Sequence, residues 1–161
     1  MKNQALHQLL DDCLQIADEN DTKIIEDILS GVKRKLESEN GTYIGHILQM
    51  KRNPERDTFE LTLPLSSLVN NNLDILHGGI TATVLDTAMG IMVNKVLPEG
   101  QAAVTNQLNI HYLAPGIGSH ITCKARIVHR GSKTMVMEAE VERDDGKKIA
   151  HATGSFFIIK K

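Results

Sequence analysis

The chain has 161 residues, 41% hydrophobic and 24% charged, proportions that are ordinary for a globular protein that buries its own core. A net charge of −2 and an aromatic content of 3% argue against general attraction to nucleic acid or to anionic membranes. Cys13 and Cys123 are too few for a disulfide or zinc framework, and the N-terminus lacks the apolar core of a signal peptide. We therefore expect a cytoplasmic protein that binds neither nucleic acid nor membrane.

Residues 1–40 differ from the rest of the chain in charge and in periodicity. Apolar side chains recur there at three- and four-residue steps in two stretches, on either side of an acidic break at 18–21. Residues 1–39 carry five Lys and Arg against nine Asp and Glu. The pattern predicts two short amphipathic helices in an N-terminal extension that serves packing or an interface, because the acidic excess opposes a DNA-reading role.

From residue 41 onward the pattern is that of strands with one central helix. Stretches 43–51 and 58–65 predict two strands joined by a polar turn at 53–57. Residues 77–97 form the least polar helical stretch, and a helix that is apolar nearly all round is normally buried. Four more strands are expected over about 101–113, 119–129, 133–142 and 147–159, with alternation that leaves one sheet face to solvent.

This order of elements predicts an α+β domain over residues 41–161. The economical packing is a curved antiparallel sheet of about six strands wrapped around the central helix. Several familiar sites are missing from the sequence: it has no G-x-S-x-G elbow, no phosphate-binding loop and no H-x-x-x-H pair. We therefore expect neither a metal site nor a bound cofactor.

Two features at the central helix suggest chemistry. Gly78-Gly79 leaves backbone N–H groups uncovered at the positive end of the helix dipole, where a carbonyl oxygen or a developing oxyanion can dock. Asp86 lies in the middle of the apolar helix, where a buried carboxylate needs a partner or a purpose. Structural explanations also remain open: a glycine turn, a helix-start role for His77, and a simple hydrogen bond that Asp86 accepts from Thr83 or Thr105.

The spacing of these residues carries a prediction about assembly. Gly78 and Asp86 are eight residues apart, about 12 Å along a helix, and about 80° apart around it. One helix therefore cannot bring the Gly78 N–H and the Asp86 carboxylate to the same substrate carbonyl. Two antiparallel copies related by a two-fold axis can, so a catalytic site here requires at least a dimer with shared sites.

The sequence resembles a known family in two places. One is the block that contains Asn71, His77-Gly78-Gly79 and Asp86, and the other is the strand from Val104 to Pro115. The similarity is to hotdog-fold acyl-CoA thioesterases, in the PaaI-like branch of the 4-hydroxybenzoyl-CoA thioesterase superfamily. It covers about residues 41–161 and is most specific over 71–86.

The resemblance implies a role for each matching residue. Asp86 is implied to be the general base that activates water, or the nucleophile at the thioester carbon. The Gly78 N–H of the opposite subunit is implied to polarise the carbonyl, with Asn71 positioning the water or the carbonyl. His77 is implied to support the loop, and Thr105 to orient the water.

Other residues are implied to bind the substrate. They are Gly79 and the hairpin Arg130-Gly131-Ser132-Lys133, where relatives often hold the CoA phosphates. A solvated β-turn explains that hairpin equally well. Two roles are open for Met89, Met92 and Val93: they could line an adaptable acyl pocket, and they are equally good core residues.

The expected activity is hydrolysis of an acyl-CoA or acyl-carrier thioester to a free acid and a thiol, by a homodimer or a dimer of dimers (a homotetramer). CoA is then part of the substrate. One alternative is a non-catalytic acyl-CoA-binding module with a regulatory role. Another is an enoyl-thioester hydratase on the same fold, which would need a His and an acid poised together. The sequence does not identify the acyl group.

Overall fold

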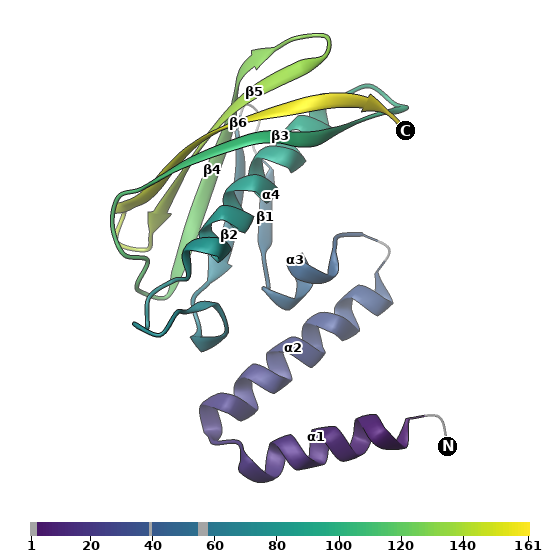
Figure 1. Ribbon diagram of the computed structural model, residues 1–161, viewed down its shortest axis with the longest axis vertical. Helices are drawn as coiled ribbons and strands as arrows, with labels where there is room; N and C mark the ends of the chain where they lie inside the picture. Colours follow the sequence, from purple (N-terminus) through teal and green to yellow (C-terminus); the bar gives the residue numbers. More distant parts are fainter. Residues whose placement is uncertain (1–2, 39, 55–57) are drawn as a thin grey trace. The chain divides into compact units, whose positions relative to one another are not determined.

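The computed structural model describes residues 3–38, 40–54 and 58–161. The chain divides into two compact units, Met1–Gln49 and Met50–Lys161 (Figure 1). Among the described residues, no helix combines the length and the apolar character needed to cross a membrane. The division into an extension over 1–40 and a domain over 41–161 stays a prediction.

The first unit contains the two helices expected there. They are α1 (Gln4–Ile16) and α2 (Glu19–Glu37), with the break at the start of the acidic stretch. A capping box begins α2: Asp18 Oδ1 accepts from the Asp21 N–H at 2.8 Å, and the Asp21 side chain accepts from the Asp18 N–H. The acidic residues of this break therefore stop one helix and start the next.

The prediction of a strand over residues 43–51 is wrong for most of that range. Residues Tyr43–Ile47 form a short helix, α3, which Thr42 caps by accepting from the Gly45 N–H at 3.2 Å. The apolar side chains of this segment follow helical steps of three and four, at Ile44, Ile47 and Leu48.

The second unit is a six-stranded antiparallel sheet with one long helix, α4 (Gly78–Val96), against one face. The strands are β1 (Lys51–Pro54), β2 (Phe59–Pro64), β3 (Gln101–Tyr112), β4 (His120–Arg130), β5 (Thr134–Arg143) and β6 (Lys148–Lys160). Their spatial order is β1-β2-β4-β5-β6-β3, which leaves short β1 and long β3 at the edges. Figure 1 shows α4 on the concave face of this curved sheet, so the predicted α+β hotdog architecture is confirmed. The expected turn at 53–57 lies mostly outside the described residues.

The core lies between α4 and the concave face. Side chains on β4 and β5 alternate between buried and partly exposed, as the sequence predicts for a sheet with one solvated face. Met89, Met92 and Val93 have exposed fractions of 0%, 4% and 0%. Since the sheet covers these three side chains, they belong to the core and do not line an open acyl pocket.

Helix α4 runs antiparallel to the edge strand β3 and is tied to it along its length. Hydrogen bonds join the two elements at the start, the middle and the end of the helix. They are Tyr112 Oη–H to Gly78 O at 2.9 Å, Thr105 Oγ1–H to Asp86 Oδ1 at 2.7 Å, and Ala103 N–H to Asn94 Oδ1 at 3.3 Å. The edge strand therefore fixes both the start of α4 and its acidic residue.

Candidate active site

Asp86 is half-buried on α4, at the side of the helix that faces β3. Of the two hydrogen-bond partners that the sequence suggests, Thr105 is the one observed, because Thr83 donates instead to Gly79 O at 3.0 Å. The predicted buried carboxylate is only partly buried in the single chain, since the sheet covers only one side of α4. Among the described residues, Oδ2 of Asp86 has no partner, so it is available to water or to substrate.

Thr105 reaches Asp86 from an irregular point in β3. Its Cα pairs with Phe156, whereas Gln107 pairs with Ser155, so the strand contains an extra residue there. Such bulges are over-represented next to active sites because they redirect a side chain.

The start of α4 presents one free backbone donor. His77 is the N-cap, and its Nδ1 accepts from the Gly79 N–H at 2.9 Å. That contact occupies the N–H of Gly79, a residue that the resemblance implies in substrate binding. The Gly78 N–H, by contrast, donates to no acceptor within residues 3–38, 40–54 and 58–161. Gly78 therefore supplies the donor at the positive end of the helix.

Tyr112 is a functional candidate that the sequence reasoning missed. Its hydroxyl donates to Gly78 O, and its ring lies over Gly78, where an added Cβ would be 3.5 Å from Tyr112 Cε1. The sequence offers one signal: Tyr112 is the single Phe, Tyr or Trp residue in the strand that carries the resemblance.

Asn71 lies beside the helix start, on the wall of a hollow of about 390 Å³ that Gly78 and Tyr112 also line. Its Oδ1 accepts from the Leu73 N–H at 2.8 Å, which shapes the loop. Asp86 and Thr105 do not line this hollow. The structure thus forms two groups, Asn71 with Gly78 and Asp86 with Thr105, and the helical rise keeps them about 12 Å apart in one chain.

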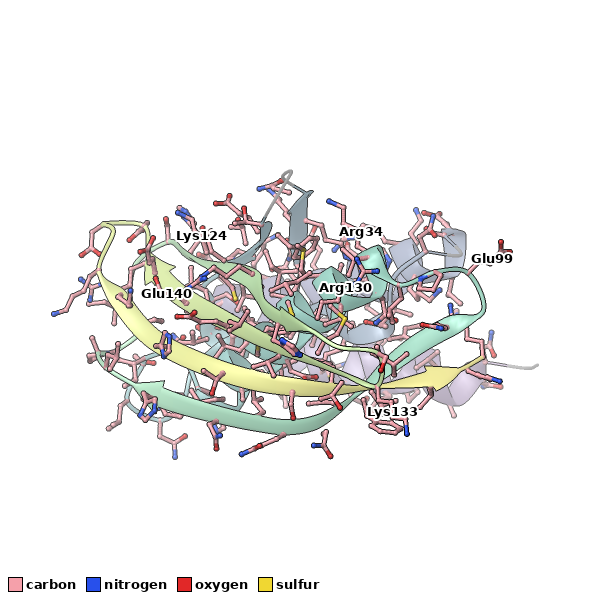
Figure 2. The ribbon with its side chains drawn as sticks, turned by 90° about the horizontal axis from the view of Figure 1, so that it is seen from above. Arg34, Glu99, Lys124, Arg130, Lys133 and Glu140 are labelled. Atoms are coloured by element: carbon pink, nitrogen blue, oxygen red, sulfur yellow. The ribbon has the colours of Figure 1, made fainter. Side chains whose placement is uncertain are left out.

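The β4–β5 hairpin is only partly available to a ligand. Arg130 Nη2 donates to Val96 O at 2.6 Å, at the C-terminal end of α4, where a cation is favourable. Gly131 N–H donates to Thr134 O at 3.0 Å and closes the turn. Ser132 and Lys133 are exposed, and Figure 2 shows Arg130 and Lys133 at this hairpin. Lys133 forms no ion pair with any described residue. Of the two cations in the hairpin, it is therefore the one whose side chain is available to a ligand.

The outer face of the sheet holds a cluster of paired charges. Glu138, Glu140 and His151 place ligand-type atoms within 4.8 Å of one another. Each carboxylate already has a cationic partner: Arg126 lies 2.5 Å from Glu138, and Lys148 lies 2.5 Å from Glu140. The hydrogen bond from His151 lowers the pKa of Glu138. These contacts make the cluster an ion-pair network of the sheet surface.

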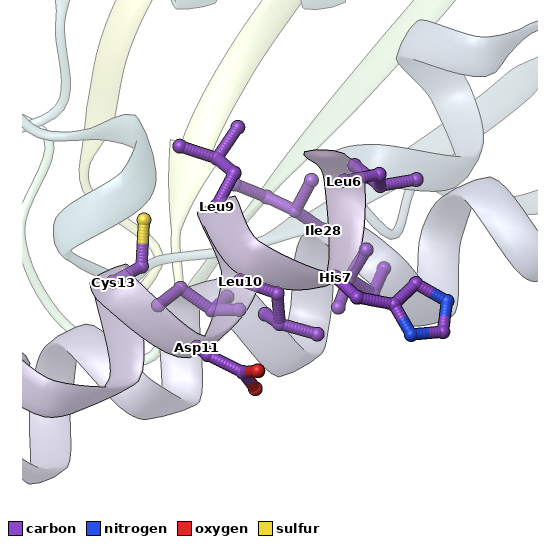
Figure 3. A pocket seen from close by; sticks show the side chains of 9 residues that line it. Leu6, His7, Leu9, Leu10, Asp11, Cys13 and Ile28 are labelled. Carbon is purple, nitrogen blue, oxygen red and sulfur yellow. The ribbon is translucent and has the colours of Figure 1, made fainter. Parts of the chain in front are cut away.

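A second hollow, also of about 390 Å³, lies in the first unit between α1 and α2. Figure 3 shows leucine side chains of α1 beside Ile28 of α2. No side chain of the described part of α1 is buried, and Leu6 and Leu9 are 62% and 59% exposed. An aliphatic surface of this kind suits packing against another apolar surface, the role predicted for residues 1–39, which stays a prediction.

Comparisons with known proteins give the family and support the fold. Residues 73–150 match the family model of the thioesterase superfamily. The crystal structure of the BH2602 protein from Bacillus halodurans with CoA is 43% identical, with a TM-score of 0.88 that covers 94% of this chain and 99% of that one.

Two named enzymes are more distant relatives. The medium/long-chain acyl-CoA thioesterase YigI of Salmonella typhimurium is 29% identical over 97 residues, 52% of this chain and 63% of that protein. The acyl-coenzyme A thioesterase PaaI of Escherichia coli is 30% identical over 91 residues, 56% of this chain and 63% of that protein. The chain thus spans somewhat less than two thirds of these two relatives. With a matching family model and a fold shared with a 43% identical protein over nearly its whole length, the chain belongs to the hotdog-fold thioesterase superfamily.

Proposed function

We propose that this protein is an acyl-CoA thioesterase that converts an acyl-CoA and water to a carboxylic acid and CoA. One observation carries the proposal. Among the described residues, α4 presents an N–H without an acceptor, at Gly78, and a carboxylate, Asp86, with one oxygen held by Thr105 and the other without a partner. The activities in the names of YigI and PaaI, and the CoA bound to the 43% identical protein, support it.

Each group has a part in the reaction. The Gly78 N–H donates to the thioester carbonyl and stabilises the negative charge that develops on its oxygen. Asp86 accepts a proton from water while the water oxygen bonds to the carbonyl carbon; the C–S bond then breaks and the thiolate takes up the proton. In a second route, the Asp86 carboxylate attacks the carbonyl carbon, the C–S bond breaks and CoA leaves as a thiolate. Water then cleaves the anhydride, which restores Asp86 and releases the proton that the thiolate takes up. A single turnover in ¹⁸O-labelled water supports the second route if label appears in the Asp86 carboxyl group, which requires water to attack the Asp86 carbon of the anhydride. Attack at the acyl carbon labels only the product acid, as in the first route.

The proposed site is shared between two subunits. Strand β3 has 12 residues and pairs on one side with β6, while its other side meets no strand of the described chain. A long exposed edge favours pairing with a second copy. A two-fold axis perpendicular to β3 would pair the two strands antiparallel and set the two α4 helices antiparallel, with Gly78 of one near Asp86 of the other. A homodimer is the smallest assembly that completes the site, and a dimer of dimers keeps the same sites.

The test is thiol release from a panel of acyl-CoA thioesters that differ in chain length and aryl character. Asp86→Asn should lower kcat by at least about 10²-fold without changing the fold, because the amide can neither take a proton nor attack carbon. Glu99→Gln, which neutralises an exposed acid in the turn after α4, is the matched control.

The alternatives give different results in the same experiment. Tight acyl-CoA binding without thiol release by the wild-type protein would indicate the binding module. Consumption of an enoyl-CoA double bond without thiol release would indicate the hydratase. Full activity in folded Asp86→Asn protein would remove Asp86 from the mechanism.

A further inference from the structure

The peptide unit that joins Gly78 and Gly79 is held at both of its polar ends. Tyr112, on β3, donates its hydroxyl to the carbonyl oxygen at 2.9 Å. His77, the N-cap, accepts from the N–H of the same unit at 2.9 Å. Because a peptide unit is planar, two opposed hydrogen bonds fix the orientation of the whole plane.

The preceding peptide unit, which carries the Gly78 N–H, is also anchored. Its carbonyl, that of His77, accepts from the N–H groups of Ile80 at 2.9 Å and Thr81 at 3.1 Å. Gly78 therefore sits between two fixed planes, although glycine is the residue with the most backbone freedom. Its N–H keeps a fixed direction and lacks an acceptor among the described residues, as expected for a preorganised donor.

Tyr112 holds the peptide unit between Gly78 and Gly79 from a position outside the core. Its side chain is 57% exposed, and its ring covers Gly78 on the wall of the hollow that Asn71 also lines. Its hydroxyl adds nothing to the buried packing, and its one described partner is the Gly78 carbonyl. We propose that Tyr112 is a positioning residue that holds the Gly78 peptide so that the Gly78 N–H points at the thioester carbonyl. The inference rests on the proposed thioesterase function.

Tyr112→Phe tests this directly, because it keeps the ring on Gly78 and removes only the donated hydrogen bond. We expect kcat to fall about fivefold to tenfold with KM unchanged, since the donor acts on the developing oxyanion more than on the bound substrate. Tyr43→Phe is the matched control, because Tyr43 is the other tyrosine of the chain and lies on α3 of the first unit.

A spectroscopic measurement separates positioning from structural support. An acyl-CoA that the wild type hydrolyses, labelled with ¹³C at the carbonyl, is bound to Asp86→Asn protein, and its C=O stretch is recorded by isotope-edited infrared difference spectroscopy. Polarisation by the Gly78 N–H lowers this frequency. Adding Tyr112→Phe should move it back toward the value in solution, and adding Tyr43→Phe should not.

The outcomes distinguish the inference from the proposed function. If the wild type releases no thiol from any acyl-CoA, the function fails and the inference with it. If the wild type is active and folded Tyr112→Phe protein keeps both kcat and the carbonyl frequency, or changes only KM, the positioning role alone is overturned. Tyr112→Met, which also keeps an apolar contact with Gly78, is measured in the same way if the phenylalanine variant does not fold.

Discussion

Thr105 and Tyr112 both face α4, although they lie seven residues apart on the same strand. On a regular strand, side chains alternate between faces, so residues an odd number apart point to opposite sides. The bulge between Thr105 and Gln107 inserts one extra residue and restores the common side. One irregularity in β3 therefore lets the same strand hold both Asp86 and the Gly78 peptide.

Thr105→Val should lower kcat about tenfold while leaving the fold intact. Valine has nearly the same shape but cannot donate to Asp86 Oδ1, and a hydrogen bond to a charged group is worth about 1.5–3 kcal/mol. Steady-state kinetics of thiol release measure the change. Thr153→Val, on the exposed outer face of β6, is the control and should match the wild type. An active Thr105→Val protein would show that the carboxylate needs no such partner.

Two inactive variants should restore activity when their subunits are exchanged. Gly78→Pro removes the donor N–H, and losing one oxyanion donor costs about 10²–10³-fold in kcat. Proline suits this first helical position, because the preceding His77 is extended at φ −63° and ψ 132°. Asp86→Asn removes the acid. In a heterodimer with shared sites, one site carries both defects and the other carries neither.

Mixing equal amounts of these two variants should return activity toward about one quarter of the wild type, if exchange is random and the sites are independent. Half of the dimers are then mixed, and each has one intact site of two. Native mass spectrometry verifies that heterodimers form. Heterodimers without activity would mean that each site is built from one chain, contrary to the helical spacing of Gly78 and Asp86.

Lys133→Ala should raise the KM for acyl-CoA several-fold without changing kcat. The exposed ammonium group, unpaired among the described residues, can attract the CoA phosphates from the β4–β5 hairpin. An acyl N-acetylcysteamine thioester lacks those phosphates, so its KM should not change. Lys51→Ala on β1 is the control. Equal effects on the KM of both substrates would show that Lys133 does not bind the CoA phosphates.

Asp144 should make folding stability sensitive to acid. Its carboxylate accepts from Ser119 Oγ at 2.7 Å and from the Ser119 N–H at 2.6 Å, and these bonds lower the pKa of Asp144. A folded-state pKa below the unfolded value gives stability above an unfolded pKa of about 3.9, and that stability is lost as the pH falls through the folded-state pKa. Asp144→Asn should therefore lower the urea midpoint at about pH 6 more than at about pH 3.

The control for this pH dependence is Glu99→Gln, whose effect on the urea midpoint should be the same at both pH values. Because Asp144 is at the surface, the difference is expected to be small. An Asp144→Asn protein that loses equal stability at both pH values would show that its hydrogen bonds do not depend on ionisation.

The sequence by itself determined the architecture, and it singled out the main residues of the proposed site. The all-round apolar pattern of residues 77–97 and the alternation of β4 and β5 are local periodicities, and each persists in the folded chain. Gly78 and Asp86 could be identified because glycines at a helix start and an acid within an apolar helix are visible without any tertiary contact. The eight-residue spacing between them then predicts a shared site from helix geometry alone.

Only the tertiary structure decided which groups support those residues. Three hydrogen bonds join elements that are distant in sequence. They link Thr105 to Asp86, Tyr112 to Gly78, and Arg130 to the end of α4. The bulge at 105–107 has no local sequence signal, because it depends on how β3 pairs with β6. The partial exposure of Asp86 likewise follows from which side of α4 the sheet covers. Local periodicity specifies elements and faces, whereas register and cross-element hydrogen bonds arise only once the elements pack.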